Sequence, residues 1–338
     1  MSGHLPTHQQ RVVVARVPVG VPTPEDFRVE FAPIPVVGDG ELLVRTIDLS
    51  LDPYLRSVMA GRHLGHAAPG SGGLMPGRAT AQVIASHVAS ISVGTYVLAE
   101  TGWQEYAAVP GSRVRQLDPR IAPLSASLGV LGMPGLTAWS GVTQLLSLSP
   151  GQTFVVSAAL GAVGSVAGQL ARHAGCRVVG VAGGREKCAR VVQQFEFDAC
   201  INYHDEHWED ALRVAAPDGV DAYFDNAGGV ILEGVLRQLQ LRGHIVLCGL
   251  IGQYNSGVPY ALPLAPVIGK RAHIHGLVVY DFESRMDDYL AIAEPMIRDG
   301  TLRFLEERAT GLTAAPAAFQ RLMSGQNIGK SVVAVSAQ

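Results

Sequence analysis

A glycine-spaced turn between an apolar run and a run of small residues carries the strongest chemical signal in the sequence. It extends from Val155 to Leu170 and reads VVSAALGAVGSVAGQL. Such a turn lets the backbone approach a pyrophosphate closely, and free N–H groups at the start of the next helix hold the phosphate charge. We therefore expect dinucleotide contacts from Ala159, Gly161, Ala162, Val163 and Gly164. Because the strict pattern Gly-x-Gly-x-x-Gly is not met, a tight turn without a ligand is the alternative.

Two cations follow the end of the next apolar run. Residues 177–182 lead into Gly183, Gly184, Arg185 and Lys187. An NAD-selective site usually places Asp or Glu at this strand end, about 20 residues after the glycine turn, to bind the ribose 2′-hydroxyl. Glycines followed by cations suit a 2′-phosphate instead, so we expect NADPH. The alternative is that Arg185 and Lys187 only solvate a helix face.

The composition limits the classes of protein that fit. The chain has 338 residues, 48% of them apolar and 16% charged, with a net charge of −3. This length favours two domains, and the slightly negative net charge does not indicate binding of nucleic acid. No apolar run approaches the roughly 18 residues of a membrane span, and residues 1–6 show no signal-peptide core. We expect a cytoplasmic protein with neither nucleic-acid nor membrane partners.

The cysteines and histidines do not predict a metal site. The four cysteines are Cys176, Cys188, Cys200 and Cys248, and no pair has zinc-knuckle spacing. We expect Cys176, Cys200 and Cys248 to be inert core thiols, with Cys188 on a helix. His63, His66 and His87 in the first third of the chain have no cysteine nearby, so we expect loop histidines and no bound zinc.

The sequence around these residues shows two different patterns of apolar runs, one in each part of the chain. Up to about residue 120, short apolar runs alternate with Gly/Pro turns, which indicates a β-rich unit. From residue 153 to 248, apolar runs alternate with helical patterns, which predicts an α/β fold with a doubly wound parallel sheet. We expect helices at 125–129 and 137–146, a loop at 251–270, a strand at 273–279 and a helix at 284–299. The tail from 306 to 335 is expected to rejoin the first unit.

Several further segments resemble one enzyme family. They are LSLDPYLR at 49–56, GMPGLTAW at 132–139, YFDNAGG at 223–229, VVYD at 278–281 and GQNIGK at 325–330. Together with the glycine turn they resemble the zinc-independent medium-chain reductases of the leukotriene B4 12-hydroxydehydrogenase, prostaglandin reductase and alkenal double-bond reductase type, to which curcumin reductase is similar. The resemblance implies a homodimer. It also implies a GroES-like substrate domain from residues 1–125 and 305–338, and a Rossmann NADP-binding domain from residues 126–304.

The resemblance also implies cofactor contacts. Lys187 and Tyr203 match the residues that flank the 2′-phosphate, Asn327 matches an asparagine near the nicotinamide ribose, and Tyr254 matches a tyrosine of the cofactor cleft. Three positions differ from the residues common in the family. Gly184 stands where Ser or Thr is common, Arg185 stands where an acidic or small residue is common, and His204 stands where lysine is common. The expected lining of the cleft further includes Asn226, Cys248, Gly249, Val279 and Tyr280.

The expected reaction is NADPH-dependent reduction of the conjugated double bond of a small apolar enal or enone. Hydride goes to the β-carbon without zinc, and the developing enolate oxygen needs hydrogen-bond donors. Tyr54 and Tyr280 are the candidate catalytic donors, since each lies in a segment that borders the family's substrate pocket; the alternative is that both only shape the pocket. A quinone reductase, an enoyl thioester reductase and a non-catalytic, crystallin-like NADPH-binding protein remain open.

Overall fold

The chain divides into two compact units. The computed structural model describes residues 6–64, 67–256 and 260–337. Unit 1 comprises residues 1–128, 306–327 and 331–338, and unit 2 comprises residues 129–305 and 328–330. Among the described residues, no helix has both the length and the apolar character that crossing a bilayer requires.

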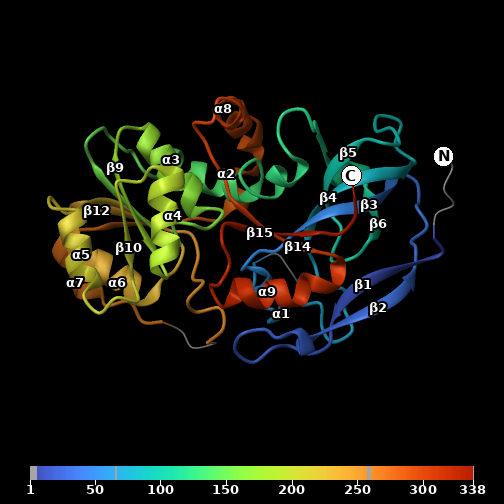
Figure 1. Ribbon diagram of the computed structural model, residues 1–338, viewed down its shortest axis with the longest axis horizontal. Helices are drawn as coiled ribbons and strands as arrows, with labels where there is room; N and C mark the ends of the chain where they lie inside the picture. Colours follow the sequence, from blue (N-terminus) through green and yellow to red (C-terminus); the bar gives the residue numbers. More distant parts are fainter. Residues whose placement is uncertain (1–5, 65–66, 257–259, 338) are drawn as a thin grey trace. The chain divides into compact units, whose positions relative to one another are not determined.

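Unit 1 is β-rich and antiparallel. It contains a two-stranded sheet, β1-β2, and a seven-stranded sheet in which β14-β15-β3-β4-β5-β7 are neighbours and β6 also pairs with β3 (Figure 1). Its strands are β1 (His8–Val14), β2 (Phe27–Pro33), β3 (Glu41–Ser50), β4 (Arg78–Ser86), β5 (Tyr96–Glu100), β6 (Tyr106–Pro110), β7 (Arg115–Leu117), β14 (Glu306–Thr310) and β15 (Lys330–Ala334). Its helices are α1 (Leu55–Met59) and α9 (Ala315–Met323), with 3₁₀ turns η1 (Pro24–Asp26), η2 (Gly111–Arg113), η3 (Leu124–Leu128) and η6 (Leu312–Ala314).

An aromatic cluster joins the two ends of the chain inside unit 1. The rings of Phe27 and Trp103 stack with their centroids 5.5 Å apart, and Phe319 of α9 meets both edge-on, at 6.2 and 5.7 Å. Trp103 and Phe319 are fully buried. Large aromatic side chains in such arrangements contribute strongly to a core, so the C-terminal helix α9 is an integral part of the N-terminal unit.

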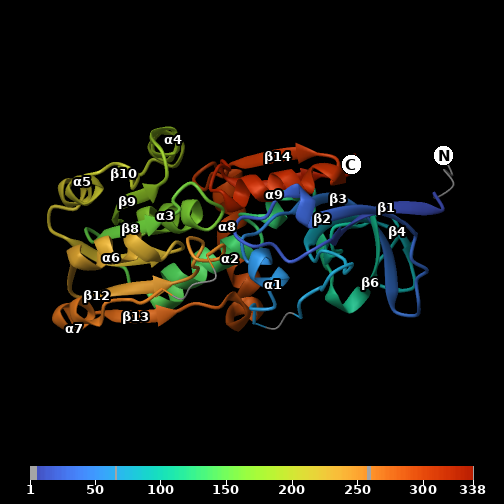
Figure 2. The same cartoon turned by 90° about the horizontal axis from the view of Figure 1, so that it is seen from below.

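Unit 2 is built on a six-stranded parallel sheet in the order β10-β9-β8-β11-β12-β13 (Figures 1 and 2). Its strands are β8 (Thr153–Ser157), β9 (Arg177–Ala182), β10 (Ala199–Asn202), β11 (Val220–Asp225), β12 (Leu239–Leu247) and β13 (His273–Gly276). Its helices are α2 (Met133–Ser140), α3 (Gly164–His173), α4 (Arg185–Phe195), α5 (Trp208–Ala215), α6 (Gly229–Gln238), α7 (Leu264–Lys270) and α8 (Met286–Arg298), with the π-helical turn η4 (Gly141–Leu145) and the 3₁₀ turn η5 (Val279–Arg285). Counted within the unit, the strand order is 3-2-1-4-5-6, which is the order of the Rossmann fold.

The helices cover both faces of this sheet because strand side chains alternate between them. Val179 and Ile201 share one hydrophobic cluster with Trp208 and Leu212 of α5. On the other face, a Cβ placed at Gly180 would lie 3.2 Å from Cys200 Sγ of β10. It would lie equally far, 3.2 Å, from Val191 Cγ1 of α4. The edge strand β10 therefore separates α4 from α5.

The predicted α/β fold class is confirmed, with three local corrections. Residues 264–270, predicted to be a loop, form α7, and none of its side chains is buried. Residues 124–128 form a 3₁₀ turn rather than the α-helix expected at 125–129. The strand expected at 273–279 ends at Gly276, after which η5 begins.

Candidate functional site

The turn after β8 is too close-packed for side chains at its critical positions. Ala158 adopts a left-handed conformation with φ of 50°, and its carbonyl accepts a hydrogen bond from the Gly161 N–H at 2.8 Å. A Cβ at Gly164 would lie 2.4 Å from that same carbonyl oxygen, whereas one at Gly161 would lie 3.1 Å away. Only glycine fits at Gly164, and the turn brings the start of α3 directly behind the end of β8. Ala159, Ala162 and Val163 lie in this turn as well.

The ends of β8 and β11, where the strand order reverses, are joined by buried hydrogen bonds. Ser157 Oγ donates to Asp225 Oδ1 at 2.9 Å and accepts the Asn226 N–H at 2.8 Å. The Asn226 side chain donates back to the Ser157 carbonyl at 2.9 Å. Asp225 also accepts bonds from the Tyr223 hydroxyl and from the Ala227 and Gly228 N–H groups. This network fixes the backbone at the point where doubly wound sheets bind their ligands.

The end of β12 lies against the end of β11. The N–H groups of Cys248 and Gly249 lie 2.8 and 3.3 Å from the Asp225 carbonyl oxygen, and burial raises the pKa of Cys248 to about 12. A Cβ at Gly249 would lie 3.3 Å from the Asn226 carbonyl oxygen and 3.5 Å from the Tyr254 hydroxyl. Burial also raises the pKa of Tyr254. Asn226, Cys248, Gly249 and Tyr254 thus lie close together beyond the ends of β11 and β12.

The residues that follow β9 and β10 form a group that we call the cationic corner: Gly183, Gly184, Arg185, Lys187, Tyr203 and His204. A Cβ at Gly183 would lie 2.8 Å from His204 Nε2 and 3.2 Å from Tyr203 Cε1, so the two rings cover this glycine. Gly184 has φ of 105°, which favours glycine, and its N–H donates to Asn202 Oδ1 at 2.7 Å. Burial raises the pKa of Tyr203, which keeps its hydroxyl protonated as a hydrogen-bond donor.

The first turn of α4 adds the cations to this corner. Arg185 is exposed and Lys187 is half-buried. Glu186 pairs with Arg190 four residues further along the helix, at 2.9 Å. The acidic side chain therefore has a cation of its own helix as its partner.

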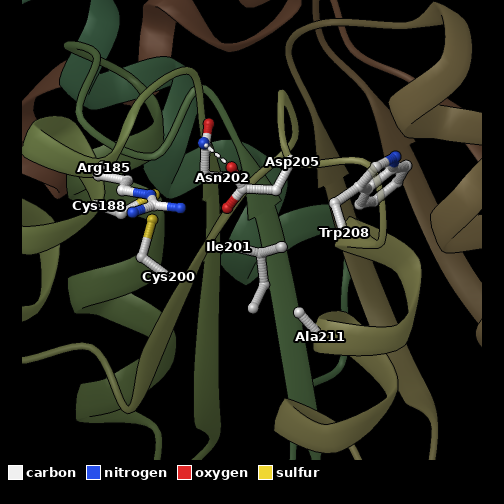
Figure 3. A pocket seen from close by; sticks show the side chains of 8 residues that line it. All are labelled: Arg185, Cys188, Cys200, Ile201, Asn202, Asp205, Trp208 and Ala211. Atoms are coloured by element: carbon white, nitrogen blue, oxygen red, sulfur yellow. Dashed lines mark hydrogen bonds between the residues drawn. The ribbon is translucent and has the colours of Figure 1, made fainter.

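A cavity of about 290 Å³ runs along β10 beside this corner (Figure 3). Its lining comes from α4, from β10 and the turn after it, and from α5: Arg185, Cys188, Cys200, Ile201, Asn202, Asp205, Trp208 and Ala211. Asn202 Nδ2 donates to Asp205 Oδ1 at 2.8 Å. Cys200, expected to be an inert core thiol, is only partly buried and lines this cavity.

The remaining candidates lie elsewhere in the two units. Val279 and Tyr280 begin η5 in unit 2, and both are half-buried. Tyr54 lies in unit 1 immediately before α1, with its ring centroid 4.8 Å from that of His63. Asn327 follows α9 and is half-buried.

Within residues 6–64, 67–256 and 260–337, no group of three or more His, Cys, Asp or Glu side chains could hold a metal ion. His66 lies outside the described residues. His244 and His275 do approach each other, with Nδ1 and Nε2 3.1 Å apart on neighbouring strands.

Comparison with known proteins identifies the family. The strand order and the glycine turn define a dinucleotide-binding fold, and residues 10–117 match the family described as the N-terminal domain of oxidoreductase. Residues 162–294 match the family described as zinc-binding dehydrogenase, although this chain has no cysteine before Cys176. The chain belongs to the medium-chain reductase family of the curcumin reductase and 2-alkenal reductase type.

Individual relatives cover almost the whole chain. NADPH-dependent curcumin reductase of Escherichia coli is 36% identical over 99% of both chains. The NADP-dependent 2-alkenal reductase of Nicotiana tabacum is 38% identical over 97% of both chains. The structure of CurA from Vibrio vulnificus in complex with NADPH has a TM-score of 0.92 at 37% identity, covering 97% of this chain and all of the other.

Sequence reasoning missed the residues that hold the site together. Ser157 ends β8 and bonds to the end of β11, whereas Asn202 ends β10 and accepts the Gly184 N–H. Trp208 and Asp205 line the cavity. Ser157 and Asn202 could have been noticed in the sequence, because each is a polar residue at the last position of an apolar strand. Their partners, however, follow from the strand order, which one sequence does not reveal.

Proposed function

We propose that this chain is an NADPH-dependent reductase of the conjugated carbon–carbon double bond of α,β-unsaturated aldehydes and ketones. The observation that carries the proposal is the cationic corner, where Gly183 and Gly184 follow β9 and no acidic residue stands at the strand end. Arg185 and Lys187 lie in the first turn of α4. Similarity to relatives named for NADPH-dependent curcumin reduction and 2-alkenal reduction supports the same substrate class.

The residues of unit 2 fit a dinucleotide. The glycine at Gly164 leaves no room for a side chain between the turn and Ala158, so backbone N–H groups can face a pyrophosphate. We assign the pyrophosphate to Ala159, Gly161, Ala162, Val163 and Gly164. We assign the 2′-phosphate to Gly183, Gly184, Arg185, Lys187 and Tyr203, and the rest of the cofactor to Asn226, Cys248, Gly249, Tyr254, Val279, Tyr280 and Asn327.

When bound, NADPH supplies a hydride to the substrate β-carbon. The chain's own task is to orient the apolar substrate, exclude water and donate hydrogen bonds to the carbonyl oxygen, on which negative charge develops. We assign the donor role to the hydroxyls of Tyr54 and Tyr280, one of which also supplies a proton to the α-carbon, directly or through water. No zinc takes part in this scheme.

The organisation of the protein follows from the same proposal. Residues 1–125 and 305–338 form the substrate domain, and residues 126–304 form the cofactor domain. We further propose that the protein is a cytoplasmic homodimer. Gel filtration with light scattering tests the dimer.

An assay of NADPH oxidation on four substrates tests the proposed function. A 2-alkenal and an aryl enone should be turned over, with the saturated carbonyl compound as the product by mass spectrometry. Preferred turnover of a benzoquinone or of a crotonyl thioester would contradict the proposal, as would binding of NADPH with no turnover of any of the four.

A further inference from the structure

Two thiols meet in the cavity beside the cationic corner. Cys188 lies in the first turn of α4, and Cys200 lies on the edge strand β10. Gly180 sets the geometry, since a Cβ there would lie 3.2 Å from Cys200 Sγ and 3.2 Å from Val191 Cγ1. Because Val191 follows Cys188 by three positions on the same helix, both thiols occupy the space between α4 and the sheet. Figure 3 shows the two sulfur atoms on one side of the cavity, beside the Arg185 guanidinium.

The two thiols also shift each other's pKa. The neighbouring Cys200 thiol lowers the pKa of Cys188 against the opposing effects of burial and of the Asp205 carboxylate. The Cys188 side chain and burial raise the pKa of Cys200. A guanidinium near a thiol also favours the thiolate. Cys188 is therefore the nucleophile of the pair and Cys200 the proton-bearing partner.

We propose that Cys188 and Cys200 form a redox-sensitive pair, which hydrogen peroxide converts into a disulfide that weakens NADPH binding. The inference about binding rests on the proposed NADPH site at Arg185, Lys187 and Tyr203. The cavity that both thiols line gives a small oxidant access to them. The other two thiols lack this setting, because Cys176 bonds to the Ser149 carbonyl and neither Cys176 nor Cys248 lines this cavity.

The oxidation balances in two steps. The Cys188 thiolate attacks one oxygen of hydrogen peroxide, the O–O bond breaks, and the departing hydroxide takes up a proton and leaves as water. The Cys200 sulfur then attacks the sulfenic acid at Cys188, the S–S bond forms, the S–O bond breaks, and the hydroxide leaves with the Cys200 proton as a second water. Two thiols are oxidised and one peroxide is reduced.

The disulfide would act on the cofactor through the backbone. A disulfide requires the sulfurs to approach to about 2.05 Å, which is shorter than any hydrogen-bonded separation. Cys188 lies in the same helical turn as Arg185 and Lys187, and Tyr203 directly follows β10, which carries Cys200. Bringing the two sulfurs together therefore moves the two cations relative to Tyr203. The hydrogen bond from Gly184 N–H to Asn202 Oδ1 joins the same two elements and would be strained by the shift.

The experiment exposes the cofactor-free protein to hydrogen peroxide and maps its tryptic peptides without reduction. Trypsin releases Cys188–Arg190 and Val191–Arg213 as separate peptides, so a disulfide joins them into one species that has lost two hydrogen atoms. We expect this species to form, to disappear with dithiothreitol, and to form more slowly when NADPH is bound. We further expect the oxidised protein to bind NADPH at least about fivefold more weakly, while NADH binding changes less.

Variants separate the pair from the other thiols. Cys188→Ser and Cys200→Ser should each abolish both the cross-linked peptide and the effect of peroxide on NADPH affinity, whereas Cys176→Ser should retain both. If a serine variant fails to fold, differential alkylation of the wild-type protein before and after peroxide gives the same answer. Peroxide that leaves both thiols alkylatable, or that oxidises each without joining them, would overturn the inference, and so would a disulfide that leaves NADPH affinity unchanged. Failure of the reduced protein to bind NADPH would instead contradict the proposed function.

Discussion

The hydroxyl of Ser157 donates to the carboxylate of Asp225 across 2.9 Å, although 68 positions separate the two residues in the chain. Both side chains are fully buried and each ends its strand, β8 or β11. This bond therefore joins the ends of the two parallel strands where the strand order of the sheet reverses. Removing one partner leaves a buried polar group unsatisfied, which costs more than the bond itself contributes.

We predict that Ser157→Ala lowers the free energy of unfolding by about 1–3 kcal/mol, since it leaves the buried Asn226 N–H without its acceptor and removes one of the donors to Asp225 Oδ1. Urea denaturation followed by circular dichroism measures the change. Ser324→Ala, at an exposed serine, is the matched control and should change stability little. Unaltered stability of the Ser157 variant would show that this hydrogen bond does not support the fold.

The two glycines of the turn should tolerate substitution differently. Gly164→Ala places a Cβ 2.4 Å from the Ala158 carbonyl oxygen, so the turn must move, and we expect NADPH affinity to fall at least about tenfold. Gly161→Ala, with 3.1 Å to the same oxygen, should cost clearly less. Fluorescence titration with NADPH on folded variants makes the comparison. Equal affinities of the two variants would argue against the assigned role of the turn.

The cationic corner should select the cofactor. We predict a preference for NADPH over NADH of at least about tenfold, or about 1.4 kcal/mol, because charge-assisted bonds to the 2′-phosphate have this strength. Lys187→Ala and Arg185→Ala should each raise the KM for NADPH and leave that for NADH nearly unchanged. Arg190→Ala is the control, since Arg190 lies on the same helix but pairs with Glu186. A Lys187 variant that affects both cofactors equally would remove the assignment.

The tyrosine hydroxyls should affect turnover and not cofactor affinity. We expect Tyr54→Phe or Tyr280→Phe to lower kcat about tenfold, less than the 10²–10³-fold typical of a sole oxyanion donor, because the cofactor's ribose hydroxyl and water can substitute. Each change keeps the aromatic ring, so packing is preserved. The measurement is single-turnover reduction of an enone at saturating NADPH. If the single and double variants both keep the wild-type rate, solvent is the proton source.

Activity should not depend on a metal ion. The chain has no thiolate before Cys176 with which to build a catalytic zinc site of the Cys-His-Cys kind. Extensive chelation followed by elemental analysis should leave the enone reductase rate intact. Stoichiometric zinc whose removal abolishes the rate would contradict this prediction.

Much of unit 2 could be predicted because its apolar runs are long and regularly spaced. The apolar runs that alternate with helical patterns from residue 153 to 248 include the four strands β8, β9, β10 and β11, at 153–157, 177–182, 199–202 and 220–225. Helix α7 escaped prediction because it follows Pro263, contains Pro266 and buries none of its side chains, so no apolar periodicity marks it. Such a helix is positioned by its neighbours and not by its own sequence pattern.

The candidate site divides in a similar way. Local patterns suffice for the glycine turn, because the close approach of Gly164 to Ala158 depends on residues six apart. The cover of Gly183 by Tyr203 and His204, and the meeting of Cys188 with Cys200, depend on which strands are neighbours. Contacts between distant segments need the sheet order, and that order was expected only in outline from the alternation of strands and helices.

Unit 1 is built from segments that lie far apart in the chain, and this has a consequence for protein synthesis. β15 pairs with β3 through Val332 and Ser50, and Phe319 packs on Phe27 and Trp103. At translation rates of about 5–20 residues per second, the nascent β3 waits on the order of tens of seconds for this partner to leave the ribosome. The parallel sheet of unit 2 is fully synthesised during that wait. A premature stop codon near the 3′ end of the message would therefore damage the unit that was translated first.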